Sequence, residues 1–140
     1  MKRVLILLAP GFEEIEAVTI IDILRRAGVA VTVAGTVEGA IEGSRKVKLL
    51  ADLSIDKVAG GDYEMIVLPG GQPGTNNLAA DERVGRILTE AAAKERYISA
   101  ICAAPSILAS AGFLAGKQAT SHPSVQARMQ EVPITPRRGW

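Results

Sequence analysis

The stretch Val4–Glu16, VLILLAPGFEEIE, decides the fold class of this 140-residue chain. Its first part, Val4–Leu8, is an unbroken aliphatic run, typical of strands that are buried on both faces of a parallel sheet. Pro10-Gly11 ends the run, and apolar residues then recur at helical spacing as far as Arg26. A buried strand that turns directly into an amphipathic helix predicts an α/β fold.

The alternation of strands and helices continues along the rest of the chain. Four further aliphatic runs predict strands, three further stretches predict helices, and Gly-rich or Pro-rich stretches separate them. The expected strands are 29–34, 47–53 (a strand or a hairpin arm after a 39–43 loop), 63–68 and 97–102, and the expected helices are 81–94, 105–111 and a short one from 123 to 129. This order predicts one domain, residues 1–140, with a mostly parallel sheet and helices on both faces.

The composition is that of an ordinary globular protein, with 48% hydrophobic residues, 22% charged residues and a formal net charge of +1. Near-neutrality and an aromatic content of 4% give no support to nucleic-acid binding. The apolar run at 4–9 is too short to cross a membrane, and acidic residues follow it where a signal peptide would be cleaved. A single cysteine cannot form an internal disulfide, so we expect a cytoplasmic protein without membrane contact.

Cys102, the only cysteine, stands where the expected strand 97–102 turns into a helix that begins near Pro105. Such a turn lifts the corner residue out of the sheet and points the positive end of the helix dipole toward it. The thiolate, which is the reactive form, would be favoured there. The alternative is a small core residue, because free cysteines are among the most buried residues. The residues alone leave both interpretations open.

Three segments of unusual composition follow expected strands: 10–16, 69–77 and 102–105. Ligands of parallel sheets bind beyond the carboxyl ends of the strands, so we expect these segments to converge on one site. Glu16 would enter that site from the first turn of a helix. A carboxyl group desolvated beside a thiolate holds its proton, and could donate a hydrogen bond to the sulfur or move a proton on a substrate. The alternative is a glutamate favoured only by the helix dipole, as Glu13 and Glu14 also are.

Gly70-Gly71 follows the expected strand 63–68. Two glycines there allow backbone N–H groups to approach an anion closely, for example an oxyanion or a carboxylate. The pair also fits a simple tight turn. Residues 70–74 match neither a phosphate-binding loop nor a dinucleotide fingerprint.

His122, the only histidine, lies one helix and a short strand beyond Cys102. A Cys–His pair is the usual way to activate a thiol, and contact between the two side chains is feasible at this spacing. A single histidine and a single cysteine without clustered ligands argue against a zinc site. We therefore expect neither a metal nor a cofactor.

Taken together, these segments resemble the ThiJ/PfpI superfamily, in the branch of the Parkinsonism-associated deglycase and its bacterial YajL-like relatives. The matching stretches cover nearly the whole chain in the expected order: LLAPGFEEIE (7–16), RRAG (25–28), VLPGGQPGTNNL (67–78), ICAAP (101–105) and TSHP (120–123). The strand-to-helix turn at Cys102 in combination with the Pro-Gly-Gly segment at 69–71 is a specific signature of this superfamily. The resemblance implies a flavodoxin-like sandwich with a nucleophile elbow at Cys102, usually assembled as a homodimer.

The resemblance also implies an activity and the residues that carry it. Cys102 would be the nucleophile and redox-sensitive thiol, and Glu16 the carboxyl group bonded to it. The other residues carried over lie around that sulfur: Gly70, Gly71 and Ala103 for the oxyanion and substrate, with His122 and Arg45 as further neighbours. The implied enzyme is a cofactor-independent deglycase or glyoxalase that acts on methylglyoxal, glyoxal or their adducts with proteins and nucleotides. The alternative is a non-catalytic redox sensor or chaperone in which Cys102 is oxidised to the sulfinic acid.

The end of the chain departs from the family pattern. Family chains continue into a Ser-Arg-Gly-Pro-like segment and a final helix that help to close the sheet and cover the cysteine pocket. The last residues here, PITPRRGW (133–140), match neither. We therefore expect a C-terminally incomplete domain, and an inactive truncated family member is a third interpretation.

Overall fold

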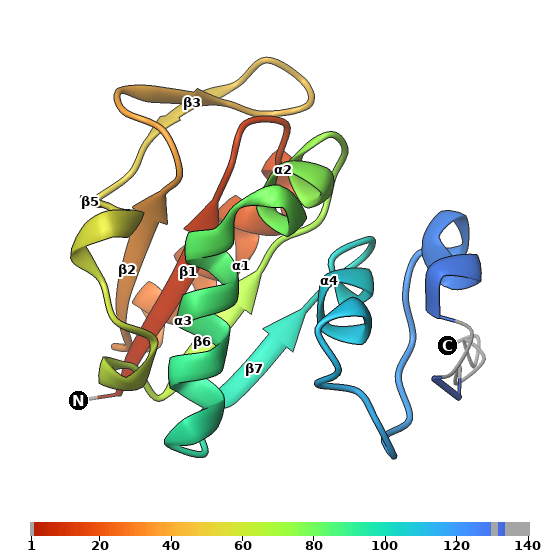
Figure 1. Ribbon diagram of the computed structural model, residues 1–140. Helices are drawn as coiled ribbons and strands as arrows, with labels where there is room; N and C mark the ends of the chain where they lie inside the picture. Colours follow the sequence, from red (N-terminus) through yellow and green to blue (C-terminus); the bar gives the residue numbers. More distant parts are fainter. Residues whose placement is uncertain (1, 130–131, 134–140) are drawn as a thin grey trace.

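The computed structural model describes residues 2–129 and 132–133, and a five-stranded parallel sheet forms its centre (Figure 1). The strand order is β5-β2-β1-β6-β7, with β1 (Arg3–Leu8) in the middle. β2 (Ala30–Gly35) and β6 (Met65–Leu68) flank it, and β5 (Leu53–Ser54) and β7 (Tyr97–Ala100) are the edges. Every pairing in this sheet is parallel, which confirms the predicted sheet.

Helices cover both faces of this sheet (Figure 1). α1 (Glu14–Arg26) packs on the face to which Ile6 and Leu8 point. On the other face, Leu5 and Leu7 meet the three remaining helices, which are α2 (Gly74–Ala80), α3 (Glu82–Ala93) and α4 (Pro105–Ser110). Each residue of β1 from Val4 to Leu8 is therefore buried on one face or the other, which explains the unbroken aliphatic run.

Four expected segments differ in the structure. The expected loop 39–43 contains β3 (Ala40–Glu42), which forms an antiparallel hairpin with β4 (Lys48–Leu50) outside the main sheet. The expected strand 47–53 is therefore divided between β4 and β5. The polar stretch 72–77 is partly helical, because α2 begins within it at Gly74. The strand before Cys102 ends at Ala100.

Short 3-10 helices connect the longer elements. They are η1 (Ile55–Lys57), η2 (Gly60–Asp62) and η3 (Pro123–Met129), and η3 confirms the helical stretch expected there. No helix of the described part of the chain is both long and apolar enough to cross a membrane. The chain end after Pro133, where we expect an incomplete domain, lies outside the described residues.

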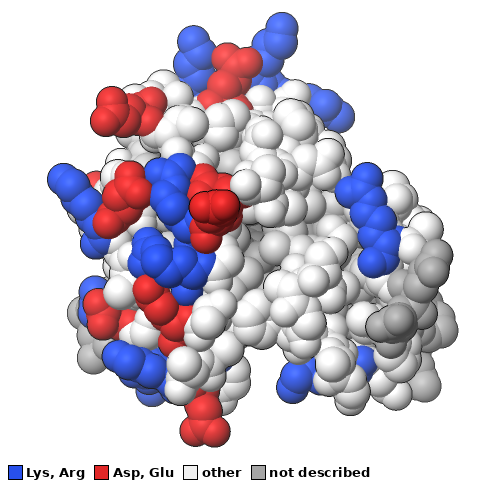
Figure 2. Space-filling view, in the orientation of Figure 1, with Lys and Arg blue, Asp and Glu red and all other residues white. Residues whose placement is uncertain are grey.

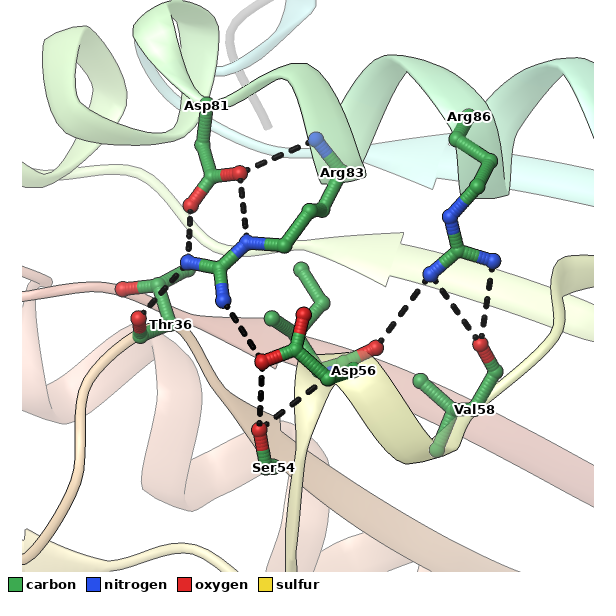
Figure 3. A network of polar contacts seen from close by, with 8 residues as sticks. Thr36, Ser54, Asp56, Val58, Asp81, Arg83 and Arg86 are labelled. Atoms are coloured by element: carbon green, nitrogen blue, oxygen red, sulfur yellow. Dashed lines mark hydrogen bonds and ion pairs between the residues drawn. The ribbon is translucent and has the colours of Figure 1, made fainter.

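An arginine network ties the start of α3 to the loop after β5 (Figure 3). The guanidinium of Arg83 donates hydrogen bonds to Asp81 at 2.7 and 2.9 Å, to Asp56 at 3.1 Å and to the carbonyl of Thr36 at 2.8 Å. Asp81 also caps α3 by accepting a hydrogen bond from the backbone N–H of Arg83. These bonds hold α3 against the carboxyl end of β2. Cys102 is not part of this network.

Candidate active site

Three segments meet beyond the carboxyl ends of β1, β6 and β7, as the sequence predicts. The backbone N–H of Glu13 donates to the carbonyl of Gly70 at 2.9 Å, and that of Gly74 donates to the carbonyl of Gly11 at 3.0 Å. The N–H of Gly70 in turn donates to Oε2 of Glu16 at 2.9 Å. The loop after β1 is thus bound to the loop after β6, with the carboxylate of Glu16 held between them.

Gly70 and Gly71 are required by close packing as well as by the turn. A Cβ atom on Gly70 would lie 2.7 Å from Cβ of Cys102 and 2.7 Å from Oε2 of Glu16. A Cβ atom on Gly71 would overlap the backbone nitrogen of Glu13, and Gly71 has a φ of +94°, which favours glycine. The absence of a side chain at Gly70 allows Cys102 and Glu16 to meet, and its absence at Gly71 allows the loop after β1 to pack against the loop after β6.

Cys102 occupies the sharp corner between β7 and α4. Its φ is 61°, in the left-handed region that residues with a side chain seldom adopt. The thiol is partly exposed and lines a pocket of about 260 Å³. The pocket is completed by Glu16, Ala100, Ile101, Pro105, Thr120, Ser121 and His122. Cys102 therefore faces a space that a small molecule can enter and is not part of the described core clusters.

The pKa of the Cys102 thiol is raised, which contradicts the expectation of a favoured thiolate. Burial is the largest cause, and the Glu16 carboxylate adds to it through a hydrogen bond and through its negative charge. The N–H groups of Ala103 and Gly71 lower the pKa, but by less. The helix dipole cannot offset a touching carboxylate, because α4 is only 6 residues long and begins with a proline that has no N–H.

The Glu16 side chain lies between the N–H of Gly70 and the sulfur of Cys102. Its carboxylate accepts from the N–H of Gly70 and also pairs with the Cys102 thiol, whose protonated form it stabilises. The site thus joins the thiol to a carboxyl group, with the N–H groups of Gly71 and Ala103 also directed at the sulfur. This arrangement can deprotonate the thiol at the moment of attack and stabilise negative charge nearby.

His122 lines the pocket, but its ring bonds to a different residue. Its backbone N–H donates to the carbonyl of Cys102 at 2.6 Å. Its Nδ1 lies 2.7 Å from Oγ of Ser124 and accepts from the N–H of Ser124 at 3.1 Å. In the described part of the chain, His122 thus bonds to Cys102 through backbone atoms. The role of the His122 ring in the chemistry stays a prediction.

Arg45 lies on the turn of the β3–β4 hairpin, is exposed, and is not among the residues that line the Cys102 pocket. Its backbone N–H donates to both carboxylate oxygens of Glu14, at 3.1 and 2.8 Å. The structure of this chain therefore does not bring Arg45 to the sulfur. The described residues contain no group of three or more His, Cys, Asp or Glu side chains that could hold a metal ion.

Glu14 has a structural role that the sequence did not reveal. Its buried carboxylate accepts hydrogen bonds from Oγ of Ser44 at 3.1 Å and from the N–H of Val47 at 3.2 Å, besides those from Arg45. Burial raises the pKa of Glu14. These bonds, together with one from its own backbone N–H, lower it by more, so the pKa lies below its ordinary value. The hairpin is thereby fixed to the first turn of α1, two residues before Glu16.

Substituting Glu16 with glutamine tests the electrostatics of the site. Because the carboxylate raises the pKa of Cys102, we expect Glu16→Gln to move the pH midpoint of Cys102 alkylation by iodoacetamide to lower pH. At neutral pH the variant should therefore be alkylated faster than the unmodified chain. Glu13→Gln is the matched control, because its carboxylate lies near Ser44 rather than the sulfur. A midpoint that stays in place, or rises, in Glu16→Gln would contradict this account of the thiol.

Comparison with known proteins agrees with the fold and with the arrangement of these segments. The DJ-1/PfpI family model matches residues 2–135. The chain is 43% identical over 129 residues to Protein dj-1beta of Drosophila melanogaster, a match that covers 91% of this chain and 69% of that protein. It is 33% identical over 131 residues to the glutathione-independent glyoxalase DJR-1.2 of Caenorhabditis elegans, covering 93% and 69% respectively.

The solved structures show the same architecture. The crystal structure of Drosophila melanogaster DJ-1beta superposes with a TM-score of 0.92 at 40% identity, covering 98% of this chain and 75% of that one. Oxidized Toxoplasma gondii DJ-1 superposes with a TM-score of 0.87 at 37% identity, covering 91% and 71%. These matches confirm the flavodoxin-like fold and the resemblance to the ThiJ/PfpI superfamily. The chain therefore belongs to the DJ-1/PfpI family.

Proposed function

We propose that this protein is a cofactor-independent glyoxalase or deglycase that acts on 2-oxoaldehydes such as methylglyoxal and glyoxal, or on their adducts with proteins and nucleotides. The observation that carries the proposal is the Cys102 thiol paired with the Glu16 carboxylate at the wall of an open pocket. The relative named a glutathione-independent glyoxalase supports the same chemistry. Such an activity would limit carbonyl and oxidative stress in the cytoplasm.

The first step is attack of the Cys102 sulfur on the aldehyde carbon of methylglyoxal. Glu16 takes the thiol proton as the S–C bond forms, so the sulfur need not be ionised beforehand. The aldehyde C=O bond opens, and its oxygen gains negative charge within reach of the N–H groups of Gly71 and Ala103. Glu16 passes the proton that it took from the thiol to this oxygen, which gives a hemithioacetal bound to Cys102 and leaves Glu16 free to act as a base again.

The second step moves a hydrogen within the bound substrate. Glu16 removes the proton from C1 and returns one to C2, which converts the hemithioacetal into the thioester of lactate. Water then attacks the thioester, the C–S bond breaks, and lactate leaves while Cys102 recovers its proton. No net oxidation occurs, because C1 is oxidised as C2 is reduced.

On an amine adduct of methylglyoxal, the same residues perform an exchange. The Cys102 sulfur displaces the amine from C1, and the thiol proton passes through Glu16 to the leaving nitrogen. The amine is released unmodified, and the hemithioacetal proceeds as before. Lactate formation from methylglyoxal without added glutathione is the direct test of the proposal, and its absence would refute the enzymatic interpretation.

We also propose that the protein acts as a homodimer that is formed through α1 and β4. Ile15 and Leu50 are 75% and 76% exposed although both are apolar, and Val18 and Ile23 of α1 are also exposed apolar residues. A hollow lined by α1 and β4 residues, among them Val18 and Leu49, joins the two elements into one face. Burial of this face against a second copy would explain why α1 carries apolar side chains outside the stripe that packs on the sheet. The expected solution mass is twice that of one chain.

A further inference from the structure

Glu14 is a buried carboxylate to which the proposed mechanism assigns no step. It lies in the first turn of α1 and is only 8% exposed. None of the ion pairs among the described residues includes it. A buried charge without an ion-pair partner is costly unless hydrogen bonds compensate it, so Glu14 depends on the hydrogen bonds that it accepts.

The β3–β4 hairpin supplies most of these hydrogen bonds, largely from its backbone. The N–H of Arg45 donates to both carboxylate oxygens, Oγ of Ser44 donates to Oε1, and the N–H of Val47 donates to Oε2. The Arg45 side chain is exposed instead, and Figure 2 shows lysine and arginine side chains projecting at the top of the view, where Figure 1 draws β3. Both oxygens of Glu14 therefore face donors that belong to the turn of the hairpin.

Gly43 allows the hairpin to lie directly on this carboxylate. A Cβ atom on Gly43 would lie 2.5 Å from Cδ and 2.7 Å from Oε2 of Glu14. The backbone extends the contact, because the N–H of Ser44 donates to the carbonyl of Phe12 at 2.8 Å. The loop after β1 is thus bound to the hairpin on one side and to the loop after β6 on the other.

Glu14 and Glu16 point to opposite sides of α1. Positions two residues apart in an α-helix are separated by about 200° around its axis, so the turn that presents Glu14 to the hairpin presents Glu16 to Gly70 and Cys102. The side chain of Glu13, which precedes the helix, forms no capping hydrogen bond, whereas the N–H of Glu14 bonds to its own carboxylate. The first turn of α1 is therefore anchored chiefly through Glu14.

We propose that Glu14 is a positioning residue that holds the Glu16 carboxyl group at the sulfur of Cys102. Its bonds to the hairpin fix the first turn of α1, and that turn carries Glu16 into the site. The inference rests on the proposed function as far as turnover is concerned. The reactivity of the thiol toward an alkylating reagent reports the position of Glu16 independently of that function.

Glu14→Gln removes the charge and presents the wrong group to the hairpin, because the amide nitrogen of glutamine would face an N–H group that cannot accept a hydrogen bond. We expect kcat for lactate formation from methylglyoxal to fall by about tenfold to a hundredfold with KM nearly unchanged, as for a misplaced catalytic group. Burial and then the Glu16 carboxylate raise the pKa of Cys102, and the variant weakens the second effect. The pH midpoint of Cys102 alkylation should therefore move to lower pH.

A double-mutant cycle distinguishes positioning from a general loss of structure. Because Glu14 acts through Glu16, Glu14→Gln should cause no further movement of the alkylation midpoint once Glu16 is already glutamine. Glu42→Gln is the matched control, because Glu42 is exposed on β3 of the same hairpin. It makes the same chemical change and should leave both kcat and the midpoint unchanged.

Gly43→Ala displaces the Glu14 carboxylate while keeping every charge, and it carries the test if Glu14→Gln does not fold. The φ of Gly43 lies outside the left-handed region, so alanine fits its backbone. The alkylation midpoint should again move to lower pH. A midpoint that stays in place in Gly43→Ala, or that moves equally in Glu14→Gln with and without Glu16, would overturn the proposal. If the midpoint moves as expected but the unmodified chain forms no lactate, the positioning role stands and the proposed function fails.

Discussion

Replacing Cys102 with serine is expected to reduce lactate formation from methylglyoxal by at least about 10³-fold, to the uncatalysed background. Serine keeps the size and the hydrogen-bonding capacity of the side chain, so the elbow should fold unchanged. A carboxylate such as Glu16 can accept a thiol proton, but the much weaker acid of a serine hydroxyl does not yield its proton to the same base. The loss should appear in kcat and in kcat/KM together, measured by enzymatic determination of lactate.

Ser99→Ala is the matched control for this experiment. Ser99 lies on β7 close to the elbow but is not among the residues that line the Cys102 pocket, so its variant should keep full activity. Turnover that is undiminished in Cys102→Ser would refute the nucleophile assignment. If neither protein forms lactate, and intact-mass measurement shows that dilute peroxide adds two oxygen atoms selectively at Cys102, the redox-sensor interpretation is favoured instead.

Gly60→Ala is expected to lower the free energy of unfolding by about 3 kcal/mol or more, because the added methyl group overlaps backbone atoms. Gly60 is buried in η2 where this segment packs against α3. A Cβ atom there would overlap the carbonyl oxygen of Ile87 and lie 2.8 Å from its carbonyl carbon. These are backbone atoms of a helix, so the clash can be relieved only by moving α3 off the sheet. The N–H of Gly60, which donates to Glu90 at 2.7 Å, would lose its partner in the process.

Gly85→Ala, within α3, adds the same methyl group but is expected to raise the free energy of unfolding. Gly85 is exposed within α3, and a Cβ atom there meets nothing within 4 Å. The variant should gain about 0.5–1 kcal/mol, because alanine loses less backbone entropy in a helix than glycine. Urea unfolding followed by circular dichroism measures both variants. Equal midpoints for Gly60→Ala and Gly85→Ala would contradict the packing described for η2 and α3.

The sequence predicted those elements that are defined by long apolar patterns. β1 and β6 are buried on both faces and read as aliphatic runs, and α1 and α3 have apolar stripes several turns long. β3 and α2 could not be predicted in this way, although a hairpin arm was one interpretation of 47–53. In β3 only Ile41 is buried, and α2 begins with the poor helix formers Gly74-Thr75-Asn76-Asn77. Tertiary bonds hold α2 in place, among them those from Gly74 to Gly11 and from Asn77 to Pro10.

The site was predicted in its parts but not in its electrostatics. The positions of Cys102, Glu16 and the glycine pair follow from the rule that parallel strands end at one edge. The protonation preference of Cys102 depends on which of two opposing groups lies nearer, the carboxylate or the helix end, and local sequence carries no such information. Glu14 was missed for the same reason, because its partners on the hairpin are distant along the chain.

The order of strands in the sheet has a consequence for the kinetics of folding. β1, α1 and β2 are neighbours in sequence and in space, so they can assemble early at little cost in loop closure. The pairings of β1 with β6 and of β6 with β7 join more distant parts of the chain. Cys102, Glu16 and Gly70 come from three of these parts and meet only when all of them have docked. The raised pKa of the thiol should therefore develop in the last phase of refolding, after most of the secondary structure has formed.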